Sequence, residues 1–499
     1  MSELYPKRLS QAFNLLLLLL HSIPLYYQLH QLSDPPGMNG YFYLKQIETL
    51  AKQGRFYFSD HSLAFLPLAF LQRILGNSLL TFQLSLALTF GFFLLGAFYF
   101  IDSINQSKNH TSAQLKIWEE ITVKTLLSFS IVSSSFFTEF SLNFYKNFFA
   151  ITLVLWSSSF QIQKRYWTSL FIFVLAFLTH KSVTLFGGLY LAAQFLEILK
   201  ETFKSKTISR QTMIVLFLSF LCSIFFGSIF LIHFPKASHF LEYLTTIWQS
   251  PIPRLSWWKH VLLQEGTRGI ESLAFILILT LYLIQRHSLL QSHRKIGDTV
   301  VLFSAIAIHP FQNADESALG YRLVLMLPAA LLPLAGTLMI QRQRGNHLLR
   351  AMNIIPYILI LYFSHPSLGF RPSLVDIQIK PFSKLYSGVS RITALVDKED
   401  YLISHHGLEF YVDYITGIRS RSFVAEPAFK NEIYRIAFVP QGRLGDGPVM
   451  NELNQAKILD IDSNYFLIKE KDWKRIAEHY HIPNSWKNPT GRRPPHVYE

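Results

Sequence analysis

Residues 78–101 read SLLTFQLSLALTFGFFLLGAFYFI, an apolar stretch without a single charged side chain. A helix needs about 20 apolar residues to cross the hydrocarbon layer of a bilayer. The stretch therefore predicts a transmembrane helix. Similar apolar runs follow one another through residues 1–365, whereas residues 366–499 have the composition of an ordinary soluble domain.

The composition of the whole chain agrees with a membrane protein. Of its 499 residues, 50% are hydrophobic and 16% are charged, where a soluble protein would carry about 25% charged residues. The net charge is +14, but the lysines and arginines gather in short loops between apolar runs, which is typical of cytoplasmic loops. We therefore expect membrane lipids as partners and no nucleic acid.

Apolar runs predict an α-helical polytopic membrane protein with about eleven transmembrane helices. No small-x-small cleavage site follows the first run, so we interpret it as an uncleaved span. The runs are 9–28, 78–101, 121–138, 147–162, 166–180, 183–199, 212–232, 270–285, 298–310, 321–340 and 351–364.

The distribution of basic residues predicts the orientation. A cytoplasmic N-terminus places the strongly basic connections on the cytoplasmic side, as the positive-inside rule requires. These connections are residues 163–165, 200–210, 285–295 and 341–350. An odd number of spans then places the C-terminal part outside. The sequence predicts a multi-pass protein of the plasma or inner membrane with an extracytoplasmic C-terminal domain.

The tail alternates between helical and strand patterns. Residues 382–396, 407–415 and 473–480 look helical, and residues 401–404 and 434–439 look like strands. This predicts a small α/β domain. We therefore expect two domains, the transmembrane domain 1–365 and the soluble domain 366–499.

The loop at residues 29–77 follows the first span and is long enough to have a function. Residues 40–53 look like a helix lying at the membrane surface, with Gly54 as a plausible C-cap. Residues 62–75 look like an interfacial or re-entrant helix. The loop carries Asp34 and Asp60. A carboxylate here can act as a general base for a hydroxyl acceptor, although Asp-Pro-Pro-Gly at Asp34 is also good turn chemistry.

Five short motifs resemble the GT-C superfamily of membrane glycosyltransferases, and the likeness extends over the whole membrane domain. In the first loop, an acidic residue precedes an aromatic helix with Tyr41 and Tyr43. The others are Ile74-Leu75-Gly76-Asn77 before the second span, Asn143-Phe144-Tyr145-Lys146-Asn147 at the fourth, Leu178-Thr179-His180-Lys181 after the fifth, and Gly320-Tyr321-Arg322 before Leu327-Pro328.

The resemblance implies an enzyme of the cell envelope. It would move a sugar from a polyprenyl-phosphate-linked donor to a lipid or glycan acceptor on the extracytoplasmic face, with inversion at the anomeric carbon. Asp34 would be the base, supported by Asp60.

Cations near the membrane face would stabilise the departing lipid phosphate. Arg322 is the first candidate because its guanidinium matches phosphate oxygens. Lys146, Lys181 and His180 are expected at the same depth. Trp257 and Trp258 could stack on a sugar ring, although tryptophans at a membrane surface also form an aromatic belt. Tyr41 and Tyr43 are further candidate substrate-binding residues.

One position departs from the pattern of the superfamily. Alignment of Tyr43 and Gly54 with the family's helix places the catalytic aspartate at Asn39, and an amide cannot accept a proton as a carboxylate does. Either Asp34 supplies the base from a shifted loop, or the protein is an inactive GT-C-like scaffold.

A transporter or polymerase of lipid-linked oligosaccharides also has many spans, although the predicted spans hold few ionisable residues. We expect no cofactor, because the histidine and carboxylates at residues 309–316 follow no strong metal-ligand spacing.

Overall fold

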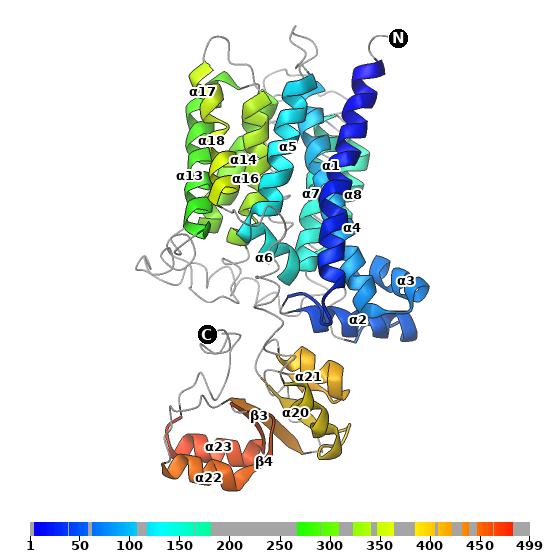
Figure 1. Cartoon of the computed structure of the whole chain (residues 1–499), viewed down its shortest axis with the longest axis vertical. Coiled ribbons are helices and arrows are strands. Elements are labelled where there is room, and N and C mark those ends of the chain that lie inside the picture. Colours follow the sequence, from blue (N-terminus) through cyan, green and yellow to red (C-terminus); the bar gives the residue numbers. More distant parts are fainter. Residues whose placement is uncertain are drawn as a thin grey trace, which may run out of the picture.

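The computed structural model consists of a helix bundle and a smaller α/β unit. Figure 1 shows the N-terminus at one end of the bundle and the α/β unit beyond the opposite end. The residues described are 4–37, 39–57, 62–106, 117–163, 165–180, 267–289, 291–308, 323–340, 347–363, 385–404, 408–421, 432–438, 447–462 and 464–482.

The bundle contains most of the predicted spans. Its helices are α1 (Leu4–His30), α4 (Ser78–Gln106), α5 (Ile117–Ser133), α6 (Ser135–Asn143), α7 (Tyr145–Ile162), α8 (Tyr166–Thr179), α13 (Thr267–Gln285), α14 (Gln291–Ile308), α16 (Leu327–Ile340), α17 (His347–Met352) and α18 (Ile355–Phe363). The predicted spans 183–199 and 212–232 lie outside the described residues.

Three helices in the described part of the chain are long and apolar enough to cross a membrane. They are Leu9–His30, Ser78–Ile104 and Leu323–Ile340, and α5 with α6 would make a fourth. The total of about eleven stays a prediction.

The predicted span 121–138 is not one continuous helix, because the helix breaks at Ser134. Helices α5 and α6 meet there at an angle of 64°. Ser134 has an extended backbone and its hydroxyl caps α6 by accepting the Phe137 N–H. The carboxylate of Glu271 in α13 accepts hydrogen bonds from Ser134 Oγ (2.9 Å) and Ser135 N (2.7 Å). These acceptors satisfy the N–H groups that the break exposes.

The first loop forms two short helices, as predicted. Helix α2 (Gly40–Gln53) ends at Gly54, and α3 (Phe65–Leu75) ends at Gly76, both in the left-handed conformation. Leu66, Phe70 and Ile74, four residues apart, form an exposed apolar stripe on α3. Such a stripe suits a helix that lies in the membrane interface.

The α/β unit is built on one mixed sheet, with the strand order β2-β1-β3-β5-β4. Strand β1 pairs in parallel with β2 and β3, whereas β5 pairs antiparallel with β3 and β4. The elements are α20 (Tyr386–Arg391), η2 (Ile392–Ala394), β1 (Tyr401–Ile403), α21 (Leu408–Thr416), β2 (Ser420–Arg421), β3 (Ile433–Phe438), α22 (Pro448–Ala456), β4 (Lys457–Asp460), β5 (Tyr465–Lys469) and α23 (Glu470–His479).

The two parts share a continuous core. One cluster of buried side chains runs from the bundle through α2 to α20, α21 and one face of the sheet. The ring of Tyr41 lies 4.8 Å from that of Tyr411, and Phe42 lies 5.1 Å from Phe410. A second cluster around Trp473 fills the space between the sheet, α22 and α23. The α/β unit is therefore docked on the first loop through α2 and α21.

Candidate functional site

A cavity of about 440 Å³ lies where the first loop meets the α/β unit. Its wall combines the loop before α2, the helix α2, the start of α4, and the helices α20 and α21. The lining residues are Ser33, Asp34, Pro35, Tyr41, Leu44, Leu79, Tyr386, Tyr411, Tyr414 and Ile415. The volume falls within the range of small-molecule sites, about 300–1,000 Å³.

Asp34 supplies the carboxylate of this cavity. It is half-buried and accepts hydrogen bonds from the Tyr41 hydroxyl and from Ser33 Oγ (3.1 Å). Burial, and then the neighbouring Asp34, raise the pKa of the Tyr41 phenol above its usual value. The phenol therefore stays a hydrogen-bond donor. It holds Asp34 at the cavity wall, and the carboxylate keeps lone pairs that can accept further hydrogen bonds.

The loop that carries Asp34 is fixed to the junction of α6 and α7. Gly37 has a φ of +78°, and a Cβ atom there would lie 2.4 Å from the carbonyl oxygen of Leu142. Asn39 Nδ2 donates a hydrogen bond of 2.8 Å to the carbonyl oxygen of Asn143. Only glycine fits the first position without strain.

The same bond explains Asn39, which we predicted as a catalytic position. Its amide acts as a donor to a backbone carbonyl, which a carboxylate cannot do. In the described structure this bond ties the loop that carries Asp34 to the end of α6. A catalytic role for Asn39 stays a prediction.

The predicted cation Lys146 lies in the first turn of α7. Its Nζ atom lies 5.4 Å from the centre of the Phe42 ring and 5.9 Å from that of Phe65. His180 caps the C-terminus of α8. The neighbouring carbonyl of Thr179 accepts a hydrogen bond of 2.6 Å from Ser62 Oγ. Lys146 thus lies at the first residue of α3, and His180 follows Thr179, which is bonded to the segment before α3.

The two predicted tyrosines have different surroundings. Tyr41 lines the cavity, whereas Tyr43 points into the bundle, where its ring lies 5.1 Å from Phe82 and 5.8 Å from Tyr145. Tyr43 is 2% exposed. Its contacts are those of a core residue, and its role in substrate binding stays a prediction.

Five predicted site residues lie outside the described residues, so the structure does not place them: Asp60, Lys181, Trp257, Trp258 and Arg322. Among the residues that the structure describes, no three histidine, cysteine or carboxylate side chains could hold a metal ion together.

Sequence reasoning missed the contribution of the α/β unit. Tyr386, Tyr411 and Tyr414 come from α20 and α21 and form the far wall of the cavity. Residues 407–415 were predicted as a helix, with tyrosines three residues apart, but nothing in the sequence linked that helix to the first loop. Buried Glu271, which caps α6, was also missed.

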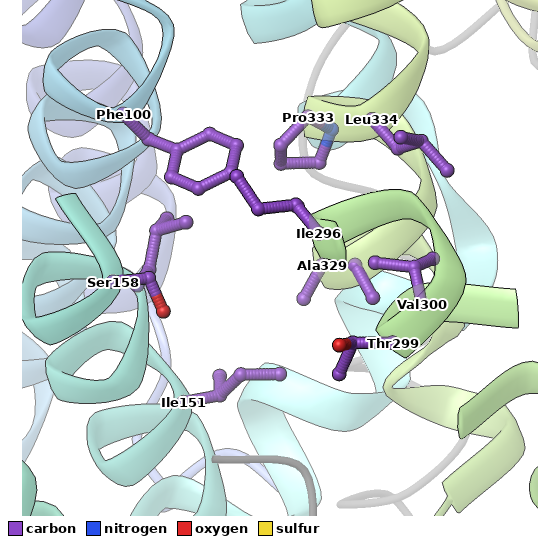
Figure 2. Close-up of a pocket in the computed structure, with 11 residues that line it drawn as sticks. Phe100, Ile151, Ser158, Ile296, Thr299, Val300, Ala329, Pro333 and Leu334 are labelled. Carbon is purple, nitrogen blue, oxygen red and sulfur yellow. The ribbon is translucent and has the colours of Figure 1, made fainter. Parts of the chain in front are cut away.

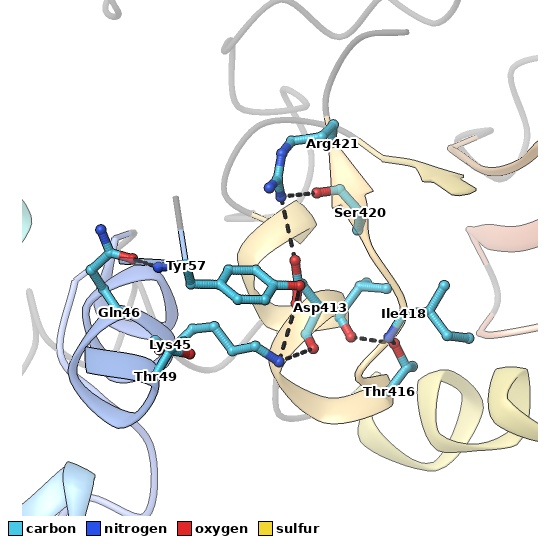
Figure 3. Close-up of polar contacts among 10 residues, drawn as sticks. Lys45, Gln46, Thr49, Tyr57, Asp413, Thr416, Ile418, Ser420 and Arg421 are labelled. Carbon is cyan, nitrogen blue, oxygen red and sulfur yellow. Dashed lines mark hydrogen bonds and ion pairs between the residues drawn. The ribbon is translucent and has the colours of Figure 1, made fainter. Parts of the chain in front are cut away.

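A polar cluster fixes α21 to α2 beside the cavity. Asp413, whose side chain is fully buried, lies 3.3 Å from both Lys45 Nζ and Arg421 Nη1. The Tyr57 hydroxyl donates a hydrogen bond of 3.0 Å to Asp413 Oδ1. Burial, and then Asp413, raise the pKa of the Tyr57 phenol. Figure 3 shows Lys45 and Tyr57 reaching Asp413 from one side and Arg421 from the other.

A second, apolar cavity lies inside the bundle between α4, α7, α14 and α16. Phe100, Ile151 and Ile296 project into it, with Ser158 and Thr299 as polar members (Figure 2). Its volume is about 30 Å³, close to that of a single water molecule. A cavity of this volume cannot hold a prenyl chain.

Comparison with known proteins identifies the fold. No sequence family and no curated protein matches the chain. Among solved structures, the chain is similar to ArnT from Cupriavidus metallidurans bound to undecaprenyl phosphate, a GT-C glycosyltransferase. The TM-score is 0.52 with 11% sequence identity, and the match covers 93% of this chain and 97% of that one. The chain therefore has a GT-C-like fold, that of a polytopic membrane protein.

Proposed function

We propose that the protein is a membrane glycosyltransferase. It would move a sugar from a polyprenyl-phosphate-linked donor to an acceptor hydroxyl on the extracytoplasmic face. The observation that carries the proposal is Asp34 at the wall of a tyrosine-lined cavity, in a chain whose fold matches a transferase bound to undecaprenyl phosphate.

In this mechanism Asp34 removes the proton from the acceptor hydroxyl as the oxygen attacks the anomeric carbon. The bond between that carbon and the phosphate oxygen breaks, and the configuration inverts. Tyr41 holds the carboxylate through its hydroxyl. The leaving polyprenyl phosphate carries away the negative charge.

Cations must stabilise that phosphate. We propose Lys146 and His180 for this role, because Lys146 lies at the first residue of α3 and His180 is next to Thr179, which is bonded to Ser62 before α3. From the sequence we also propose Arg322 and Lys181 as phosphate-binding cations. Asp60 is proposed to support the base, and Trp257 and Trp258 are proposed to stack on the sugar.

The test uses purified, detergent-solubilised full-length protein and a panel of radiolabelled polyprenyl-phosphate sugars. We expect Asp34→Asn to lower turnover by about 100-fold or more, since a general base typically contributes that much. Asp397→Asn, at an exposed position of the α/β unit, is the matched control and should match the parent.

The outcomes of these assays distinguish the candidate bases and the alternative functions. Normal turnover of Asp34→Asn would remove Asp34 as the base, and a loss in Asp60→Asn alone would assign the base to that residue. A parent protein that transfers no sugar from any donor would favour an inactive scaffold or a transporter of lipid-linked oligosaccharides.

A further inference from the structure

The cavity between the first loop and the α/β unit has an unusual combination of groups. Four of its ten lining residues are tyrosines, and three of these come from the α/β unit. Among the described lining residues Asp34 is the one charged side chain, and none is a lysine or an arginine. Aliphatic contacts come from Leu44, Leu79 and Ile415.

These groups suit a sugar ring. The faces of aromatic rings pack against apolar C–H surfaces, while phenol hydroxyls and a carboxylate bond to hydroxyl groups. Tyr386 is 57% exposed, so its ring is available to a ligand, whereas Tyr411 is only 1% exposed and forms a rigid wall.

The charge of the cavity decides which part of a substrate it takes. A phosphate group would meet the Asp34 carboxylate without a described cation in the wall to offset the repulsion. Lys146 instead lies against Phe42 and Phe65, which are not among the lining residues.

We infer that the α/β unit completes a binding site for an uncharged or amino-substituted pyranose, and that Tyr386 and Tyr414 grip its ring. The assignment of this pyranose as part of the acceptor rests on the proposed function. The binding itself does not, because a saccharide would bind whether or not transfer follows. The α/β unit is thereby a determinant of acceptor specificity.

The experiment measures binding without turnover. Saturation-transfer difference NMR on the full-length protein would use methyl glycosides of glucose, mannose, galactose and glucosamine, with glucose 6-phosphate as the anionic probe. At least one glycoside should bind, and more tightly than the phosphate. We expect Tyr386→Ala to weaken that binding roughly fivefold, as for loss of an aromatic contact.

Two further variants keep the test decisive. Tyr414→Leu removes a hydroxyl and a ring that α21 contributes to the cavity wall, and it should also weaken binding. Tyr27→Ala is the matched control, because Tyr27 is 65% exposed on α1 and outside the cavity wall. Binding that is equal in Tyr386→Ala, Tyr414→Leu and the parent would overturn the inference, as would tighter binding of the phosphate.

The outcomes distinguish this inference from the proposed function. Glycoside binding that depends on Tyr386, in a protein without transferase activity, would support the inference and refute the function. Transferase activity that does not change in Tyr386→Ala and Tyr414→Leu, with no glycoside bound, would support the proposed function and refute the inference.

Discussion

Asn39 is the residue at which this chain departs from the superfamily it resembles. Its amide donates to the Asn143 carbonyl oxygen, so an aspartate there would place a carboxylate against a carbonyl with no proton between them. We expect Asn39→Asp to lower stability by about 1–3 kcal/mol and to leave turnover below that of the parent. Thermal unfolding and the transfer assay measure the two effects.

Asn39→Ala provides the comparison for that experiment. It removes the donor without adding a charge, so it should destabilise the protein less than Asn39→Asp. A gain in turnover for Asn39→Asp would show instead that position 39 faces the reacting atoms and that the parent site has lost its base.

At the scale of elements, the break between α5 and α6 has a specific cause. Glu271 is 1% exposed and accepts bonds from Ser134 Oγ, Ser135 N and, at 3.4 Å, Phe136 N. The far end of α6 carries Leu142 and Asn143, which contact the Asp34 loop. Glu271 is therefore a positioning residue that acts on the candidate site through α6.

Glu271→Ala would leave those donors buried without an acceptor. We expect a loss of stability of about 1–3 kcal/mol and lower turnover, with partial rescue in Glu271→Gln, which keeps one acceptor oxygen. The control is Ser272→Ala, since the buried Ser272 hydroxyl has no hydrogen-bond partner in the described part of the chain. If Glu271→Ala behaves like Ser272→Ala, the cap does not hold α6.

The sequence predicted the long helices well and the break poorly. Apolar runs are visible in composition, so 147–162 and 166–180 match α7 and α8 closely. The break in the run 121–138 could not be predicted from that run alone, because the acceptor that permits it, Glu271, lies far along the chain. Strands β2, β4 and β5 were missed in the α/β unit, where short strands carry a weak pattern.

At the scale of the whole molecule, the first loop and the α/β unit line one cavity. Tyr41 and Tyr411 lie 370 positions apart in the chain, and a single sequence holds no signal for such a contact. Asp34 could be predicted because it follows a span and precedes an aromatic helix. The tyrosines of α20 and α21 could not, since their role depends on how the unit docks.

The buried tyrosines of the docking surface predict that the stability of the folded state falls at alkaline pH. Burial raises the pKa values of the Tyr41, Tyr57, Tyr411 and Tyr414 phenols. In the unfolded chain these groups lose protons near pH 10. Above that pH the folded state binds more protons than the unfolded state, so stability falls as the pH rises.

The contribution of the raised pKa values to the free energy of unfolding is therefore complete below about pH 10 and is lost above it. We expect the thermal unfolding temperature to fall between about pH 9.5 and 11, and to fall less in Tyr57→Phe than in the parent. Tyr27→Phe, with an exposed ring, should follow the parent. An equal fall in Tyr57→Phe would show that Tyr57 does not link pH to docking.

We expect docking to depend on Asp413, whose buried carboxylate contacts Lys45, Arg421 and Tyr57. Asp413→Asn would leave two cations without their counter-charge, which typically costs about 3–5 kcal/mol when such a pair is buried. Lys45→Met leaves Arg421 in place and should cost less. Hydrogen exchange of α2 and α21 would measure both, and the double variant would give their coupling.

A variant inside the α/β unit separates docking from folding of the unit. Arg435 binds Glu470 at 2.9 Å within the unit, so Arg435→Met should raise exchange in β3 and α23 and leave α2 unchanged. Asp413→Asn should instead raise exchange in both α2 and α21. Because Tyr386, Tyr411 and Tyr414 reach the cavity only when the unit is docked, glycoside affinity and turnover should fall with it. Faster exchange in α21 with α2 unchanged and glycoside affinity intact would mean that this polar cluster does not hold the two parts together.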